Sequence, residues 1–320
     1  MAAAFLLAAC GGTGAVSSPP ASTSSLATCS LPVVTSTKNG GSYASQNGFI
    51  AVPSGAFTVD SAASGPTYDW VARRWLPVLA SEVLPDGSAY AYEQELPDGP
   101  YEIHMVQVAT GADKVVLHMP YDNAYSIVAL QPEGIYLVPI LHRSGTPTGL
   151  WLFSSTRSTL TAVPGAADLS WNVIEGGSAW GGPAGGDTLD RLDLSSGVVT
   201  PWFQHAIAMA QGIGSSFGPS VVGFDHSGQP LVAFYPPVDA TASPVPQPTP
   251  EVWLVSSPTQ AKKLTGIALP AYLRTGPTDI HGTWLVGSDG FYLYTDAGFR
   301  RAAPMPPGPV GDFQIAGTCS

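Results

Sequence analysis

One short motif recurs along this chain and restricts the folds open to it. Residues 83–94 read VLPDGSAYAYEQ, which is an apolar pair, a Pro-Asp-Gly turn and an alternating strand. Gly suits a turn position with positive φ, and Pro, Asp or Ser suits the positions before it. Each copy therefore predicts a β-hairpin. The other copies, some of them weaker, lie at residues 50–60, 129–140, 172–182, 222–234 and 285–296.

A second hairpin follows four of these units. Each has an alternating apolar strand, a small polar turn and another short strand, and they start at Glu102, Gly149, Leu189 and Glu251. Trp151 and Trp253 occupy equivalent positions in this unit. We expect them to pack between the layers rather than to contact a ligand. Two hairpins in succession give four antiparallel strands.

The spacing of the turns predicts an all-β fold. Gly87, Gly134, Gly177 and Gly228 are 47, 43 and 51 residues apart, and a four-stranded unit of that period is typical of a β-propeller blade. Residues 29–320 then form a single propeller of six blades with about 49 residues each, or alternatively seven with about 42. In the copies around Gly55 and Gly290, the glycine also fits the next turn of the blade instead of the first. The assignment of strands to blades, and the number of blades, therefore stay open by one.

The stretch LPDGSAYAY at residues 84–92 resembles the Ser-Pro-Asp-Gly core of TolB-type propeller repeats, with Leu84 where that family usually has Ser. The other five copies are degenerate. The resemblance implies a periplasmic or surface propeller of the bacterial cell envelope that is used for protein contacts, and it implies no catalytic residues.

The N-terminus predicts a lipid anchor. The apolar run at residues 2–9 is shorter than the roughly 20 residues that span a bilayer, and Leu7-Ala8-Ala9-Cys10 resembles a bacterial lipobox. We therefore expect residues 1–9 to be a signal-peptide remnant, Cys10 to be lipidated, and the uncharged Gly/Ser/Thr/Pro/Ala stretch up to residue 28 to be a flexible tether. No Lys or Arg precedes the run, and a chance Cys after an apolar start is the alternative.

The remaining two cysteines bracket the predicted domain. Cys29 and Cys319 are an even pair, and such pairs form disulfides in oxidising compartments. The alternative is two free thiols. A propeller closes its ring by pairing strands from its two termini, so we expect the strand at residues 311–318 to complete the first blade beside the segment after Cys29, with the disulfide locking the closure.

Composition excludes one class of partner. The formal net charge is −11, with 12 Lys and Arg against 23 Asp and Glu, whereas nucleic-acid binding needs clustered cations. Basic residues occur at most in pairs such as Arg73-Arg74, which we interpret as solvated surface.

Chemical motifs are sparse. Residues 214–218 match Gly-x-Ser-x-Gly, but a strand follows instead of the helix that a nucleophile elbow requires. The six His are scattered without metal-ligand spacing, and no calcium loop is present. We predict no catalytic residues, no metal and no cofactor.

The long segments 203–218, 235–250 and 266–282 place the predicted binding face, because loops above about 12–15 residues are usually functional or disordered. They belong to the face opposite the tight turns. We expect a binding module for a protein, peptide or glycan; an envelope-surface glycan hydrolase or lyase and a purely structural surface protein are the alternatives. Aromatic, Arg and other charged residues are the candidate contacts: Tyr121, Asp122, Arg143, Trp202, His205, Tyr272, Arg274, Asp279 and His281.

Overall fold

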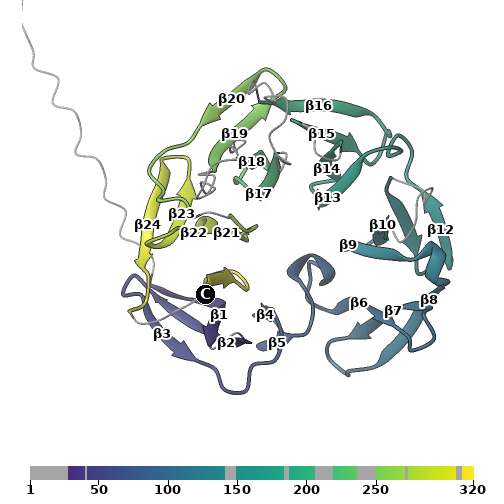
Figure 1. The fold of residues 1–320 in the computed structure, drawn as a ribbon, viewed down its shortest axis with the longest axis horizontal. Helices are drawn as coiled ribbons and strands as arrows, with labels where there is room; N and C mark the ends of the chain where they lie inside the picture. The colour runs from purple at the N-terminus through teal and green to yellow at the C-terminus, as the bar shows by residue number, and fades with distance from the viewer. Residues whose placement is uncertain are drawn as a thin grey trace, which may run out of the picture.

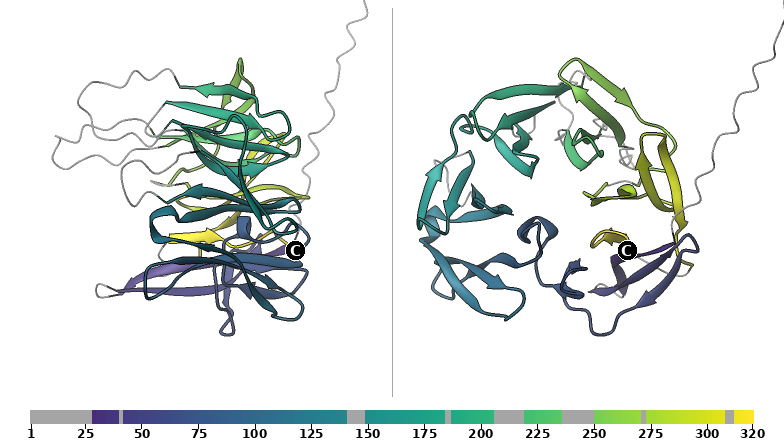
Figure 2. Two further views of the ribbon diagram at one scale, coloured as in Figure 1. Left: turned by 90° about the vertical axis from the view of Figure 1, so that its right-hand side faces the viewer. Right: turned by 180° about the vertical axis from the view of Figure 1, so that it is seen from behind.

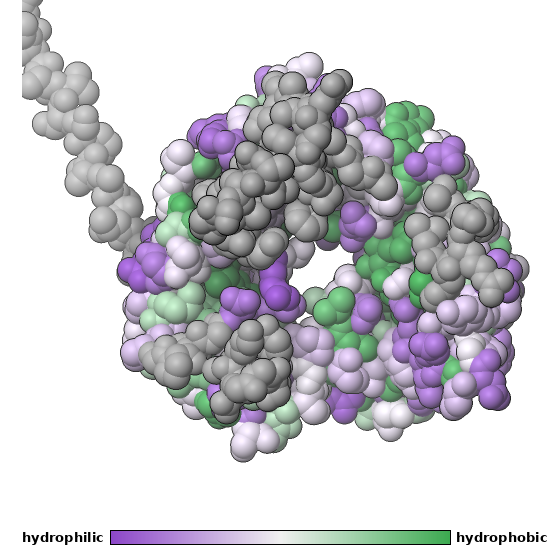
Figure 3. Space-filling model, viewed as in Figure 1, coloured by the Kyte–Doolittle hydropathy of each residue, from purple (hydrophilic) through white to green (hydrophobic). Residues whose placement is uncertain are grey.

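The computed structural model describes residues 28–39, 42–140, 149–183, 187–205, 219–235, 250–270, 273–307 and 312–320. Over these residues the chain forms strands joined by turns and two 3-10 helices, η1 (Ala80–Glu82) and η2 (Tyr121–Asn123). Seven antiparallel sheets stand around a central opening (Figures 1 and 3). The fold is a β-propeller, so the all-β prediction is confirmed. No helix among the described residues is long and apolar enough to cross a membrane.

We number the sheets in order around the ring and give their strands from the centre outward. Sheet 1 has β25 (Asp312–Ile315), β1 (Cys29–Asn39), β2 (Ser42–Val52) and β3 (Ala56–Val59). Sheet 2 has only β4 (Thr67–Asp69) and β5 (Arg74–Leu76). Sheet 3 has β6 (Ala89–Glu95), β7 (Tyr101–Gln107) and β8 (Asp113–Met119).

The other four sheets have four strands each. Sheet 4 has β9 (Tyr125–Gln131), β10 (Gly134–Pro139), β11 (Trp151–Ser154) and β12 (Thr159–Ala162). Sheet 5 has β13 (Ser170–Glu175), β14 (Ser178–Gly182), β15 (Thr188–Asp193) and β16 (Val199–Gln204). Sheet 6 has β17 (Ser220–Phe224), β18 (Pro230–Phe234), β19 (Glu251–Ser257) and β20 (Gln260–Lys263). Sheet 7 has β21 (Thr278–Asp279), β22 (Gly282–Val286), β23 (Gly290–Thr295) and β24 (Gly298–Pro304).

Six sheets thus have three or four strands, and sheet 2 has two. The predicted six blades, and the alternative of seven, differ only in whether sheet 2 is counted. In sheet 3 the innermost position is taken by Val83, which forms an isolated bridge with Tyr90 of β6.

The predicted hairpins match the strand pairing. The turns of Gly87, Gly134, Gly177 and Gly228 each join the first and second positions of a sheet, and the four second hairpins are β7–β8, β11–β12, β15–β16 and β19–β20. Gly55 and Gly290 lie later: Gly55 is between the third and fourth strands of sheet 1, and Gly290 follows the second strand of sheet 7. The offset in sheet 1 arises because its innermost strand comes from the C-terminus.

The ring closes as the sequence predicts. β25 pairs antiparallel with β1, from Val33↔Ile315 to Ser36↔Asp312. Cys29 and Cys319 form a disulfide with a Cα–Cα distance of 5.6 Å. Two backbone hydrogen bonds join Ser30 and Ser320, at 2.8 and 3.2 Å, so the two ends are held by covalent and backbone contacts together.

The core consists of apolar clusters between neighbouring sheets. Ile103 of sheet 3 packs with Ile127 of sheet 4, for example, and Trp284 of sheet 7 packs with Leu31 of sheet 1. Trp151 and Trp253 are half-buried against such clusters, as expected of core residues. The cluster between sheets 2 and 3 is the smallest, because its buried members are only Leu76, Val78 and Val108.

Candidate functional site

Sheet 2 has only two strands, and we call the region beside it, between sheets 1 and 3, the notch. The chain is described without a gap from residue 42 to 140, and over that range β4 and β5 are the only strands between sheets 1 and 3. The notch holds a cavity of about 500 Å³, which lies within the usual range of small-molecule pockets. It is bounded by residues that follow β3, by sheet 2 and by sheet 3, and its main lining side chains are Asp60, Tyr68, Arg73, Arg74, Trp75 and Tyr90.

Two arginines line this cavity: Arg73 ends the turn between β4 and β5, and Arg74 begins β5. The Asp69 carboxylate accepts a hydrogen bond of 2.7 Å from the Ala72 N–H and so shapes the turn. Arg73 has a φ of +52°, in the left-handed region that non-Gly residues rarely occupy. The Arg74 Nη2 donates to the Val108 carbonyl of sheet 3, whereas the Arg73 side chain has no partner among the described residues.

An aromatic cluster makes the inner wall rigid. Tyr68 packs edge-on against Trp70 and Trp75, with ring centroids 4.8 and 5.2 Å away. The Trp75 indole N–H donates to Asp60 Oδ2 at 3.0 Å, and the Trp70 indole N–H donates to the Thr318 carbonyl at 2.7 Å. Sheet 2 is thereby fixed to both sheet 1 and the C-terminal segment.

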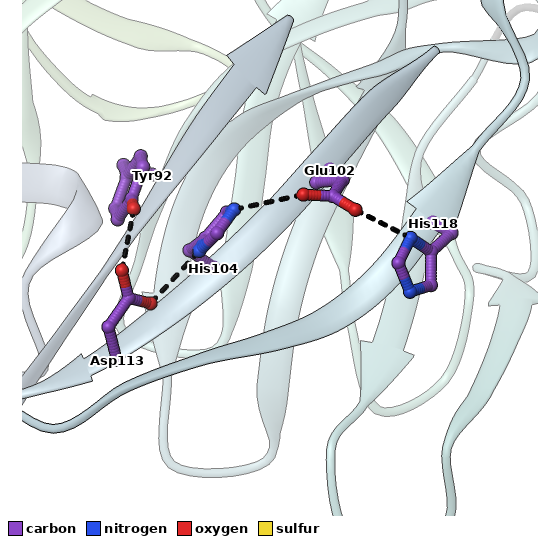
Figure 4. A network of polar contacts seen from close by, with 5 residues as sticks. All are labelled: Tyr92, Glu102, His104, Asp113 and His118. Carbon is purple, nitrogen blue, oxygen red and sulfur yellow. Dashed lines mark hydrogen bonds and ion pairs between the residues drawn. The ribbon is translucent and has the colours of Figure 1, made fainter. Parts of the chain in front are cut away.

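Beside the cavity, sheet 3 carries a network of five polar side chains, none of which is among the residues that line the cavity (Figure 4). Tyr92 donates to Asp113 Oδ2 at 2.7 Å, and Asp113 Oδ1 lies 2.9 Å from His104 Nδ1. His104 also stacks on Tyr92, at a centroid distance of 4.6 Å. Glu102 extends this network of polar contacts. Its Oε2 lies 3.3 Å from His104 Nε2, and its Oε1 lies 2.8 Å from His118 Nδ1. Tyr90, which lines the cavity, is two residues before Tyr92 on β6 and thus on the same face.

The electrostatics of this network follow from its contacts. Burial, together with donation to Asp113, raises the pKa of Tyr92 to about 12. The same hydrogen bond, followed by the contact with His104, lowers the pKa of Asp113 below its usual value. The His104 Nε2 is buried and makes no hydrogen bond of good geometry, and Nδ1 faces Asp113. Neither ring nitrogen is therefore open to a substrate, and the network orders sheet 3 beside the cavity rather than serving as an exposed general base.

The predicted binding residues are expected together on the face opposite the tight turns. Figure 2 shows the ring of sheets from the side and from behind. Tyr121 and Asp122 form η2, between sheets 3 and 4. Trp202 lies in β16, and His205 directly follows that strand. The Trp202 indole N–H donates to the Val255 carbonyl at 3.3 Å, and the Arg191 guanidinium lies 4.9 Å from its ring centroid. His205 stacks on Phe234 at 3.9 Å, with Nε2 3.2 Å from Glu251 Oε2.

The prediction of a single patch opposite the tight turns is wrong, because Asp279 and His281 lie on the face of the tight first-to-second turns. They belong to the turn between β21 and β22, a first-to-second turn beside the disulfide. Asp279 Oδ2 accepts from the Trp284 indole N–H at 2.7 Å and from the Cys319 N–H at 2.9 Å, and Oδ1 accepts from the His281 N–H at 2.7 Å. Asp279 therefore supports ring closure. The sequence suggested one loop at 266–282 because β21 is only two residues long.

The other predicted residues are placed as follows. Arg274 donates from Nη1 to Gln314 Oε1 of β25 at 3.2 Å. Arg143, Tyr272 and Cys10 lie outside the described residues, as does the Gly-x-Ser-x-Gly match at residues 214–218. Strand β17 follows that match, as the sequence indicates. Among the described residues, no three His, Cys, Asp or Glu side chains are arranged to hold a metal ion.

Sequence reasoning missed the notch. Arg73 and Arg74 are both exposed, as their interpretation as solvated surface predicts. That interpretation does not reveal the cavity, because nothing local in the sequence distinguishes an exposed pair at a cavity from any other exposed pair. The available signal is the stretch from Thr67 to Leu76, TYDWVARRWL, in which a short hairpin is followed by Pro77 and no second hairpin before the next repeat at residue 83.

Comparison with known proteins gives no family. No protein-family model and no curated protein matches the chain. Among solved structures, an acylaminoacyl peptidase from Pyrococcus horikoshii aligns over 87% of this chain at 12% identity and a TM-score of 0.45, and the chain spans 46% of that protein's length. A calcium-binding protein, regucalcin, from Agrobacterium tumefaciens aligns over 76% of this chain and 74% of its own at 16% identity and a TM-score of 0.38. A chain of a nidogen/laminin complex aligns over 90% of this chain and 98% of its own, at 10% identity and a TM-score of 0.41.

Proposed function

We propose that this protein is a lipid-anchored, extracytoplasmic binding module whose propeller engages a protein, peptide or glycan of the cell envelope. The lipobox-like Leu7-Ala8-Ala9-Cys10 and the uncharged tether up to residue 28 support the anchor. The Cys29–Cys319 disulfide supports an oxidising compartment, since cytosolic proteins rarely keep such bonds.

The observation that carries the binding function is the cavity in the notch. Arginine and aromatic side chains contribute the most binding energy per residue, and here two arginines, two tyrosines and a tryptophan line a cavity of about 500 Å³. Binding is favoured over the alternative of a glycan hydrolase or lyase, because the His104–Asp113 pair is closed off by its own carboxylate neighbours.

The anchor is tested by replacing Cys10 in the full chain. We expect Cys10→Ala to move the protein from the membrane fraction to the soluble extracytoplasmic fraction, because no acyl chain can then be attached. Cys29→Ser is the matched control, since it also removes one cysteine but leaves the anchoring residue intact, and it should stay with membranes. Retention of Cys10→Ala with the membrane would contradict the lipoprotein proposal.

Binding is tested separately on the notch. The full-length wild type and Arg74→Gln are compared for capture of defined envelope components, namely purified glycans and peptidoglycan fragments. We expect binding that Arg74→Gln weakens, and a parallel panel of hydrolase and lyase substrates should show no turnover. Turnover lost with substitution of His104 would favour the enzyme instead.

A further inference from the structure

We infer that the notch cavity binds an acidic saccharide, with the carboxylate held by Arg73 and Arg74 and a sugar ring against the aromatic wall. The inference rests on the proposed binding function and specifies its ligand. It uses two exposed arginines that line the cavity.

Charge is the first argument. The whole chain has only 12 Lys and Arg against 23 Asp and Glu, yet two arginines meet at this one cavity. The lining carboxylate, Asp60, already accepts from the Trp75 indole N–H at 3.0 Å and from the Ala62 N–H at 3.1 Å. The guanidinium of Arg73 has no partner among the described residues, and a single hydrogen bond fixes Arg74 by one nitrogen. Such donors suit a carboxylate, which guanidinium groups bind in bidentate fashion.

The aromatic lining is the second argument. Tyr68, Trp75 and Tyr90 line the same cavity, and among the described residues the hydroxyls of Tyr68 and Tyr90 have no hydrogen-bond partner. Small-molecule sites typically join apolar and aromatic walls to a few well-placed polar groups. A sugar ring presents an apolar C–H face and hydroxyls at its edge, so it matches aromatic walls with free phenol groups.

The backbone conformation of Arg73 provides a variant for the test, together with a matched control. Its φ of +52° is strained for any residue except Gly, and to a lesser degree Asn or Asp. Ser158, in the turn between β11 and β12, has nearly the same φ of +51° and lines no part of this cavity. A glycine at either position relieves the strain, but only at position 73 does it also remove a cation from the cavity.

The test is a binding titration of the full-length protein with oligogalacturonate and with the neutral galactose oligomer of equal length, followed by calorimetry. We expect saturable binding of the acidic oligomer, at least tenfold weaker binding of the neutral one, and a further loss of at least tenfold in Arg73→Gly and Arg74→Gln. The melting temperature of Arg73→Gly should equal or exceed that of the wild type. Ser158→Gly should likewise melt at or above the temperature of the wild type, but with unchanged affinity for the acidic oligomer.

Three results would overturn the inference: equal binding of the acidic and neutral oligomers, unchanged affinity in Arg73→Gly, or tighter binding of inorganic phosphate than of the acidic oligomer. None of them affects the membrane fractionation of Cys10→Ala, so failure of the ligand assignment is distinguishable from failure of the proposed location.

Discussion

At the scale of single residues, Gly87 belongs to a turn of the repeat and also lies close to Asp69, beside the notch. It sits in the turn before β6 with a φ of +71°, and a Cβ there would lie 2.5 Å from Asp69 Oδ2. Asp69 shapes the turn that carries Arg73. We expect Gly87→Val to lower the free energy of unfolding by about 1–3 kcal/mol, since a β-branched residue is strained at positive φ, as measured by chemical denaturation.

Gly228 is the matched control for this substitution. It has a φ of +77° in the corresponding turn of sheet 6, but a Cβ at this position would have no described atom within 4 Å. Gly228→Val should therefore show only the backbone strain and a smaller loss of stability. Equal losses of stability in the two variants would mean that the close approach of the new side chain to Asp69 contributes nothing to the destabilisation by Gly87→Val.

At the scale of the element, the polar network of sheet 3 predicts a dependence of stability on pH. The pKa of Asp113 is lowered in the folded protein, first by the Tyr92 hydroxyl. A lowered folded-state pKa stabilises the protein above the unfolded pKa of about 4, and the effect is lost as the pH falls through the folded value. Tyr92→Phe removes this hydrogen bond.

We therefore expect Tyr92→Phe to melt below the wild type at pH 6 and to approach it at pH 3, in thermal melts followed by circular dichroism. Tyr90→Phe is the control, since Tyr90 lies on the same strand and face but makes no hydrogen bond to a described carboxylate. A difference between wild type and Tyr92→Phe that is constant with pH would exclude this role for Asp113.

The elements also show where sequence reasoning succeeds and where it does not. The hairpins at Gly87, Gly134 and Gly228 were predictable because turn chemistry is local to four or five residues. Strand β21 was not, because two residues carry no periodic signal, and Asp279 was therefore assigned to a loop. The notch was not predictable either, since it depends on how the short hairpin of sheet 2 packs between its two neighbouring sheets, and a turn motif of four or five residues carries no information on that packing.

At the scale of the whole molecule, one disulfide spans 290 residues of sequence and joins the two ends of the ring. Replacing both cysteines, as in Cys29→Ser with Cys319→Ser, should lower the free energy of unfolding by about 2–4 kcal/mol. The measurement is equilibrium denaturation of the oxidised wild type and the double variant. Reduced wild type is the control and should match the double variant, while a double variant as stable as the oxidised wild type would show that β25–β1 pairing alone closes the ring.

Strand β25 is synthesised last but pairs with the first strand, β1, and this order matters during synthesis. Until residues 312–315 have been synthesised, β1 presents one side of an 11-residue strand without its neighbour. An open strand edge of that kind invites pairing with another chain. The last few residues thus act as the protein's own protection against self-association, and a chain that stops short of them would be an aggregation hazard and not merely a weaker propeller.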